Sequence, residues 1–317
     1  MASQDGYTGY YRELLSWYRS RYSENHIPSS CGGSLRVALP REVSREEVAV
    51  VASGRTEYIE KYLELARDLS RRGISICLYD HCGQGDSDRQ LNDRQKGYID
   101  SFDTYVDDLG RVIDRVGGAA ESTMVRIISH SMGATVAALY GQRHPTRVSR
   151  MVLGSPMCAI RTGVIIPQFL IRPMVSFACR FGYGEQYLPT TGPYRADPEF
   201  SENLFTSDEY RFCYNRYLTN SLDFAPLGGP TYRWLHEAYK AMKKMNENSE
   251  GLECPILTFA AANDQVIKSE KVRRWCERSE NCSYRQYQDA RHELFMERDE
   301  IRDDIVNRLA DFFNAGG

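Results

Sequence analysis

The sequence predicts an α/β fold in which a mostly parallel sheet is flanked by helices and carries one inserted, mainly helical cap. Short apolar runs alternate with amphipathic helical stripes along most of the chain, an order that places a parallel sheet between two layers of helices. The alternation stops near residue 157 and resumes at Pro255. We therefore expect a core domain formed by residues 1–156 and 250–317, with residues 157–249 inserted as the cap.

Strands are predicted where β-branched and other apolar residues form short runs: 34–39, 47–52, 74–79, 125–128, 148–153 and 255–264. The alternating residues 282–287 predict one more strand. Helices are predicted where apolar residues recur every three or four positions: 59–69, 102–116, 134–142, 269–279 and 301–312. The first of these helices should end at Gly73, because glycine is a common residue just past a helix.

One turn between a predicted strand and a predicted helix contains a candidate nucleophile. Residues 129–133, Ser-His-Ser-Met-Gly, follow the run 125–128 and precede the helix that begins at Ala134. A small-x-Ser-x-Gly turn in this position is how an α/β-hydrolase exposes a nucleophilic serine, since only small residues fit two positions before and after it. Ser129 stands where Gly is usual and is small enough. The turn makes Ser131 the candidate nucleophile, although the pentapeptide alone also suits an ordinary strand–helix turn.

A serine hydroxyl becomes a strong nucleophile when a base accepts its proton, and that base needs an acid to hold its tautomer. In this fold the acid and then the histidine follow the nucleophile along the chain. His292 lies near the C-terminal end, and Asp264 ends the strand predicted from Pro255. Both follow predicted strands, at the sheet edge where open α/β sheets place their chemistry. We expect Ser131, Asp264 and His292 to form a catalytic triad.

Each partner of the serine has an alternative interpretation. An aspartate after a strand often serves only as a turn former, and a single histidine is often a surface residue. The loop after residues 151–154, the other position for the acid, contains no carboxylate, and Asp289 is close to His292 in sequence. Chain order and the lack of a rival favour Asp264.

Composition argues against several other classes of protein. A chain of 317 residues with a net charge of −3 has no basic footprint for nucleic acid. It contains no apolar run long enough to span a bilayer, and we expect no secretory signal. The nine cysteines are an odd number, and several fall inside predicted strands or helices. We therefore expect reduced thiols and a cytoplasmic location rather than a disulfide framework.

The inserted segment is rich in aromatic residues, because residues 157–250 hold 16 of the 36 Phe, Tyr and Trp side chains. A cap of this kind over Ser131 predicts an apolar pocket for an acyl chain, since substrate pockets are mostly apolar. The alternative is that these side chains form a core for the cap itself.

Two other motifs are incomplete. Gly83-x-Gly85 follows a strand as in a dinucleotide-binding turn, but Asp88 occupies the position of the third Gly and no helical pattern follows. The run from His292 begins like a zinc-protease helix, yet Met296 stands where the second His is required. No Cys-x-x-Cys motif occurs, so the sequence supports no zinc site of that type.

Six stretches resemble the branch of α/β-hydrolases that includes monoacylglycerol lipases and the bacterial inner-membrane lysophospholipase, and the chain is most similar to the latter. They are 54–57, 80–87, 105–109, 130–133, 229–234 and 292–293, within about residues 45–315. Stretch 229–234 is the most discriminating, because cap sequences differ between branches. The resemblance implies hydrolysis of esters of single-chain lipids, with no metal or organic cofactor. Lysophospholipids are the first choice, and monoacylglycerols or general carboxyl esters are the alternatives.

The resemblance also implies the position of the oxyanion hole. The tetrahedral intermediate needs two N–H donors, one from the residue after the nucleophile and one from the loop after the third strand. These correspond to the backbone N–H groups of Met132 and Arg55. The family often has His-Gly-x-Gly in that loop, where this chain has Ser53-Gly54-Arg55-Thr56. The alternative for Arg55 is an exposed loop residue without a role.

The N-terminal residues raise the question of membrane contact. Aromatic and apolar residues between Tyr7 and Tyr22 fall on one helical face with arginines nearby. This pattern predicts either an amphipathic helix on an anionic membrane or a helix packed on the core. The apolar cap stretch 164–171 is a second candidate for lipid contact.

Two other functions stay open. An aminopeptidase of the same fold would need a carboxylate in the cap to bind the ammonium group of its substrate. The candidates are Glu185, Asp197, Glu199 and Glu209. A non-catalytic protein that keeps the fold is disfavoured by the complete set of Ser, Asp and His. The sequence indicates no oligomeric state.

Overall fold

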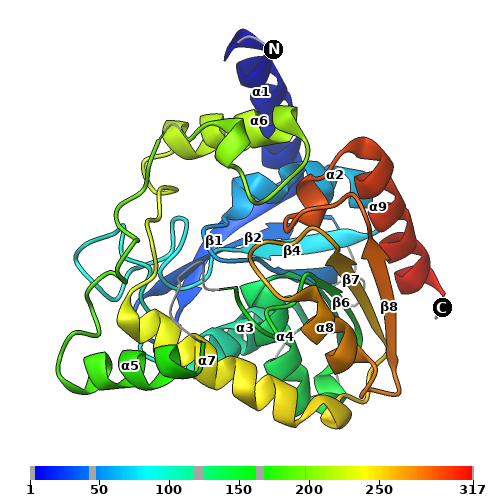
Figure 1. Cartoon of the computed structure of the whole chain (residues 1–317). Coiled ribbons are helices and arrows are strands. Elements are labelled where there is room, and N and C mark those ends of the chain that lie inside the picture. The colour runs from blue at the N-terminus through cyan, green and yellow to red at the C-terminus, as the bar shows by residue number, and fades with distance from the viewer. Residues whose placement is uncertain (1–3, 43–47, 118–123, 162–167, 197, 316–317) are drawn as a thin grey trace.

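The computed structural model describes residues 4–42, 48–117, 124–161, 168–196 and 198–315. Within them, eight strands form one sheet in the order β1-β2-β4-β3-β5-β6-β7-β8 (Figure 1). The strands are Tyr22–Pro28 (β1), Ser34–Pro40 (β2), Val48–Ala52 (β3), Ser75–Tyr79 (β4), Val125–His130 (β5), Val148–Gly154 (β6), Ile256–Ala261 (β7) and Cys282–Tyr287 (β8). β2 pairs antiparallel with β1 and β4, and the other pairs are parallel. The predicted mostly parallel sheet is confirmed.

β3 pairs with β4 on one side and with β5 on the other. Along the chain, β4 is therefore added to one side of β3, and β5 and the later strands are added to the opposite side. In open α/β sheets, ligands bind at the carboxyl ends of the strands at such a reversal of strand order. The loop 53–56 follows β3, and Ser131 follows β5. The topology therefore brings the predicted nucleophile and the predicted oxyanion loop to the same edge.

Helices cover both faces of the sheet (Figure 1). One face carries α1 (Gln4–Arg21), α2 (Leu63–Ser70) and α9 (Asp299–Asn314), and the other carries α3 (Phe102–Gly117), α4 (Met132–Arg143) and α8 (Ser269–Cys276). In β3, Val48 and Val50 pack in one core cluster, while Ala49 and Val51 pack in the other. Because alternate side chains of a strand point to opposite faces, this double burial explains the uninterrupted apolar run of β3.

The inserted segment supplies α5 (Gln168–Arg180), α6 (Glu209–Ser221) and α7 (Tyr232–Glu247). Leu235 and Met242 of α7 pack in the core cluster of α3 and α4. Tyr214 and Leu218 of α6 pack in the cluster on the other face of the sheet. Apolar side chains of the cap helices thus extend the core of the main body. The division into two domains stays a prediction from the sequence.

Four elements differ from the expectation. The strand predicted over 255–264 ends at Ala261, so Asp264 lies in the loop after it. β1 was not predicted, and Tyr22 begins this strand instead of continuing the N-terminal helix. It is an edge strand of mixed polarity and is mostly exposed, so it lacks an apolar pattern. The helix expected from Ile59 begins as a 3₁₀ turn, Ile59–Tyr62, before α2. α8 ends at Cys276 rather than at Ser279.

Cys276 and Cys282 form a disulfide that links the end of α8 to the start of β8. The expectation of reduced thiols rather than a disulfide framework is wrong for this pair. The two cysteines belong to different elements, and their proximity depends on the turn between them, which has no signature in cysteine spacing. The other cysteines are free. No helix in the described ranges is both long and apolar enough to cross a bilayer.

Candidate active site

The turn between β5 and α4 holds Ser131 in a strained conformation. Its φ of 52° and ψ of −115° lie in a region that few residues other than glycine adopt. A Cβ atom at Gly133 would overlap backbone carbonyl oxygens at the end of β3. Ser129 Oγ donates a hydrogen bond of 2.9 Å to the carbonyl oxygen of Val152 in β6. Small residues at 129 and 133 therefore let the turn lie against both neighbouring strands.

His292 lies between Ser131 and Asp264 in a chain of hydrogen bonds. Nε2 of His292 is 2.8 Å from Oγ of Ser131, and Nδ1 is 2.7 Å from Oδ2 of Asp264. All three residues are buried, and Ser131 is the most exposed of them at 8%. When Nδ1 carries the proton and donates a hydrogen bond to Asp264, Nε2 accepts a hydrogen bond from the serine hydroxyl. This is the arrangement that a nucleophile, its base and an orienting acid require.

The loop after β7 fixes the orientation of Asp264. Oδ1 accepts hydrogen bonds of 2.8 Å from the backbone N–H groups of Val266 and Ile267, which leaves Oδ2 directed at His292. Burial alone would raise the pKa of Asp264, but His292 and the two N–H groups hold it below its usual value. The carboxylate is therefore ionised at neutral pH. Asp289, the alternative acid, is exposed.

Two backbone N–H groups beside Ser131 are available to a ligand. Met132 is the first residue of α4, so its N–H has no acceptor within the helix. In the loop after β3, the N–H groups on either side of Arg55 donate to the side chains of Glu57 and Gln84. The N–H of Arg55 itself has no acceptor among the described residues. These are the two donors that the resemblance implies.

Next to His292 lies a buried charged network that the sequence pattern did not reveal. Nδ1 of His130 is 3.0 Å from Oε1 of Glu57, and Nε2 is 3.0 Å from the carbonyl oxygen of His292. Nζ of Lys61 is 3.3 Å from Glu57 and 2.6 Å from Glu293. Burial opposes the charge of each group, but the ion pairs raise the pKa of His130 and Lys61 and lower that of Glu57. Glu57, His130 and Glu293 each adjoin a predicted site residue or loop in sequence, which was the available signal, whereas Lys61 has no such neighbour.

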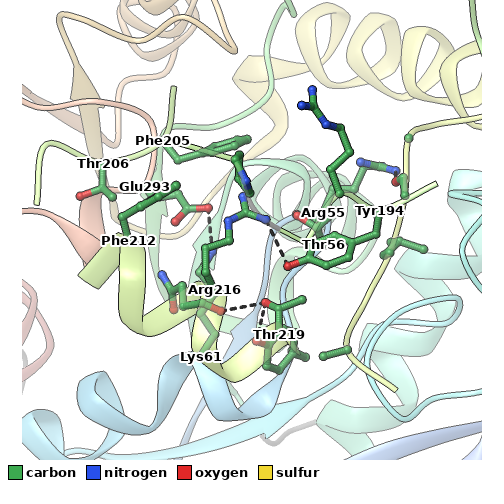
Figure 2. Close-up of a pocket in the computed structure, with 18 of the residues that line it drawn as sticks. Arg55, Thr56, Lys61, Tyr194, Phe205, Thr206, Phe212, Arg216, Thr219 and Glu293 are labelled. Atoms are coloured by element: carbon green, nitrogen blue, oxygen red, sulfur yellow. Dashed lines mark hydrogen bonds and ion pairs between the residues drawn. The ribbon is translucent and has the colours of Figure 1, made fainter. Parts of the chain in front are cut away.

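A cavity of about 330 Å³ opens beside these residues, between the loop after β3 and the cap (Figure 2). Its lining includes Arg55 and also Glu293, the residue after His292. The cap contributes, among others, Tyr194, Phe205, Phe212 and Arg216. The described lining residues do not include Ser131. The cavity is therefore adjacent to the hydrogen-bonded serine rather than centred on it.

The sheet, the strained serine turn and the Ser–His–Asp chain together define the class of α/β-hydrolases. The family described as serine aminopeptidase, S33 matches residues 44–299, and the chain belongs to this family.

Relatives with known names agree with the class. Lysophospholipase L2 of Escherichia coli strain K12 is 30% identical over 282 residues, which cover 86% of this chain and 82% of the relative. A probable lysophospholipase L2 of Haemophilus influenzae is 29% identical over 281 residues, 88% of each chain. A solved structure of a soluble variant of the monoglyceride lipase of Saccharomyces cerevisiae shares the fold, with a TM-score of 0.74, 17% identity and coverage of 93% of this chain and 96% of that one. The family and fold expected from the six stretches are confirmed.

Proposed function

We propose that this chain hydrolyses the carboxyl ester of lysophospholipids. The observation that carries the proposal is the chain of short hydrogen bonds from Ser131 through His292 to Asp264, at the carboxyl edge of the sheet and beside a cap cavity. Such a set of groups attacks acyl carbonyls, and an ester is the easier substrate because an alcohol leaves more readily than an amine. The names of two relatives, lysophospholipase L2, support a single-chain phospholipid as the substrate.

In the proposed mechanism, Oγ of Ser131 attacks the ester carbonyl carbon while Nε2 of His292 accepts the hydroxyl proton. Asp264 stabilises the imidazolium, and the N–H groups of Met132 and Arg55 hold the developing oxyanion. As the tetrahedral intermediate collapses, His292 donates its proton to the departing glycerol oxygen and Ser131 remains acylated. Water then attacks the acyl carbon as His292 takes its proton. The fatty acid leaves, and the proton returns to Ser131.

The charges in the cavity disfavour an aminopeptidase. Such an enzyme needs an unpaired carboxylate for the substrate ammonium, and the carboxylate that lines the described part of the cavity, Glu293, is paired with Lys61. Three of the four cap candidates are exposed and do not line the cavity: Glu185, Glu199 and Glu209. The fourth, Asp197, lies outside the described residues.

The test is fatty-acid release from lysophosphatidylcholine and from a monoacylglycerol with the same acyl chain. We expect the wild type to prefer the lysophospholipid, and Ser131→Ala to lower kcat by about 10⁴-fold or more. Thermal unfolding should show that the variant keeps the fold. Near-normal turnover by Ser131→Ala would reject Ser131 as the nucleophile. A preference for the monoacylglycerol would replace the lysophospholipid with the neutral lipid as the substrate.

We also propose peripheral contact with a lipid surface, through α5 rather than through α1. Leu14 and Tyr18 of α1 are buried in the core, so this helix packs on the main body. On and just after α5, Met174, Phe177 and Phe181 are exposed. Exposed apolar residues grouped in this way are typical of interaction surfaces. Part of the apolar stretch 164–171, residues 164–167, lies outside the described residues.

Co-sedimentation with phospholipid vesicles tests this contact. Phe177→Ser and Phe181→Ser together should lower the bound fraction, whereas Leu204→Ser, at another exposed apolar residue, should not. Binding unchanged by the double substitution would remove α5 from the proposal. The cytoplasmic location stays a prediction, and the Cys276–Cys282 disulfide departs from the reduced state on which it was argued.

A further inference from the structure

The cavity beside the hydrogen-bonded serine carries an excess of positive charge. The charged residues of its described lining are Arg55, Lys61, Arg195, Arg216 and Glu293. Lys61 and Glu293 neutralise one another across 2.6 Å. The other three charged residues are Arg55, Arg195 and Arg216. Within the described part of the chain, none of these arginines forms an ion pair with a carboxylate. Guanidinium groups without a counter-ion in a cavity attract an anionic ligand.

The side chain of Arg216, in α6, lines the cavity, and neighbouring aromatic residues fix its position. Its guanidinium carbon is 5.4 Å from the ring centre of Phe212 and 5.7 Å from that of Tyr194. Nη1 donates a hydrogen bond of 3.4 Å to the hydroxyl of Tyr194. Figure 2 shows Arg216 in the middle of the pocket, with Phe212 and Tyr194 on its two sides and the Lys61–Glu293 pair nearby. Contact with aromatic rings fixes the planar group, and its other N–H donors have no acceptor in the described residues.

Arg55 adds a second positive charge that lacks a carboxylate. Its Nη2 donates to the carbonyl oxygen of Gly228, and its Nε has no acceptor in the described residues. The guanidinium lies 5.4 Å from the ring centre of Trp234. Burial lowers the pKa of Arg55 to about 10, so the side chain stays charged at neutral pH.

We propose that Arg216 binds the phosphodiester of the substrate head group, with the charge of Arg55 adding to the attraction. A phosphodiester presents two non-bridging oxygens, which share one negative charge and match the paired N–H groups of a guanidinium. A neutral monoacylglycerol has no such group. The inference rests on the proposed function: the head group of the lysophospholipid would occupy the cavity while its ester bond lies at Ser131.

The first experiment compares kcat/KM on lysophosphatidylcholine and on a monoacylglycerol with the same acyl chain. Arg216→Gln should lower kcat/KM for the phospholipid by about 10- to 100-fold, the effect expected from loss of a charge-assisted hydrogen bond. It should leave kcat/KM for the monoacylglycerol nearly unchanged. Arg216→Lys should retain part of the activity on the phospholipid, because it keeps the charge and loses the planar fork. Arg274→Gln, at an exposed arginine of α8 outside the cavity and away from α5, is the matched control and should behave as the wild type.

Equal losses on both lipids, or no loss on either, would overturn the head-group role of Arg216. Equal losses would mean that this arginine only supports the cap through Phe212 and Tyr194. Thermal unfolding of each variant shows whether the cap is still in place.

The second experiment separates this inference from the proposed function. Glycerophosphocholine, which has the phosphodiester and no acyl chain, is added to assays of a short neutral ester. It should inhibit the wild type competitively, and Arg216→Gln should raise its inhibition constant about 10-fold or more. If lysophospholipids are not cleaved but this arginine-dependent inhibition is found, the proposed function fails while the phosphate site stands. If inhibition is absent or does not depend on Arg216, the phosphate site is overturned whichever ester is cleaved.

Discussion

Oε1 of Glu57 lies 3.0 Å from Nδ1 of His130, and both side chains are buried beside His292. Glu57 belongs to the loop after β3, and His130 immediately precedes Ser131. Nε2 of His130 also lies 3.0 Å from the carbonyl oxygen of His292. One buried pair therefore ties together the three segments that carry the oxyanion loop, the candidate nucleophile and the candidate base.

Glu57→Gln should destabilise the protein, and the loss should depend on pH. Removing one partner of a buried ion pair costs about 3–5 kcal/mol, because the other charge is left uncompensated. The pKa of Glu57 is lowered in the fold, so its stabilising contribution is complete above its unfolded pKa and is lost as pH falls through the folded value. The pKa of His130 is raised, so its contribution is complete below its unfolded pKa and is lost as pH rises through the folded value.

The loss in unfolding free energy should therefore be largest between about pH 4.5 and 6.5, the ordinary pKa values of the two groups, and smaller at higher pH. Urea unfolding at about pH 5.5 and about pH 9 measures it. The same loss at both pH values would contradict the ion-pair account.

Asp264→Asn should lower kcat by about 10³- to 10⁴-fold, because an amide holds the wrong tautomer of His292. The amide oxygen can still accept from the N–H groups of Val266 and Ile267, so the melting temperature should change little. Hydrolysis of a chromogenic ester measures the effect. Asp289→Asn, at the alternative acid, serves as the control and should have wild-type activity. The reverse pattern would assign the acid to Asp289.

Gly133→Ala should destabilise the protein by about 3 kcal/mol or more and abolish activity, because the added methyl overlaps backbone carbonyl oxygens at the end of β3. Gly9→Ala is the matched control. It lies on an exposed face of α1 with nothing within 4 Å of the new methyl, and should stabilise the helix by about 0.5–1 kcal/mol. Chemical unfolding compares the two. A stable, active Gly133→Ala protein would contradict the packing of this turn.

Cys31 should react with iodoacetamide at unusually low pH. Its sulfur lies 2.7 Å from that of Cys82, and hydrogen bonds from Cys82 and Ser29 lower the pKa of Cys31 to about 6. Because the thiolate is the reactive form, the alkylation rate under reducing conditions should reach half its plateau near that pH. At Cys179, whose pKa is raised by burial, the rate should still be rising above about pH 9.

Peptide mass spectrometry across pH measures both cysteines in one sample. Cys82→Ala should move the midpoint of Cys31 upward, because alanine has no donor to replace the Cys82 hydrogen bond that favours the thiolate. A midpoint for Cys31 near the ordinary thiol value of about 8.5 would contradict the pairing.

Local periodicity and chain order were enough to predict the parallel strands, most helices and the candidate triad. β3 could be recognised because burial on both faces requires a continuous apolar run, and Ser131 because its turn admits only small neighbours. Asp264 and His292 followed from their order and their positions after strands. The structure brings all three within hydrogen-bonding distance, and their catalytic roles are the proposal that Ser131→Ala and Asp264→Asn test.

Tertiary structure alone decided the features that depend on which distant side chains meet. The pairing of Glu57 with His130, the disulfide of Cys276 with Cys282 and the place of Arg216 in the cavity have no periodic or positional signature. The sequence shows which residues can carry a charge, but it does not show which residue each one contacts or whether it is buried. Whether an arginine is neutralised by a carboxylate or left available to a phosphate is therefore settled only when the cap folds onto the sheet.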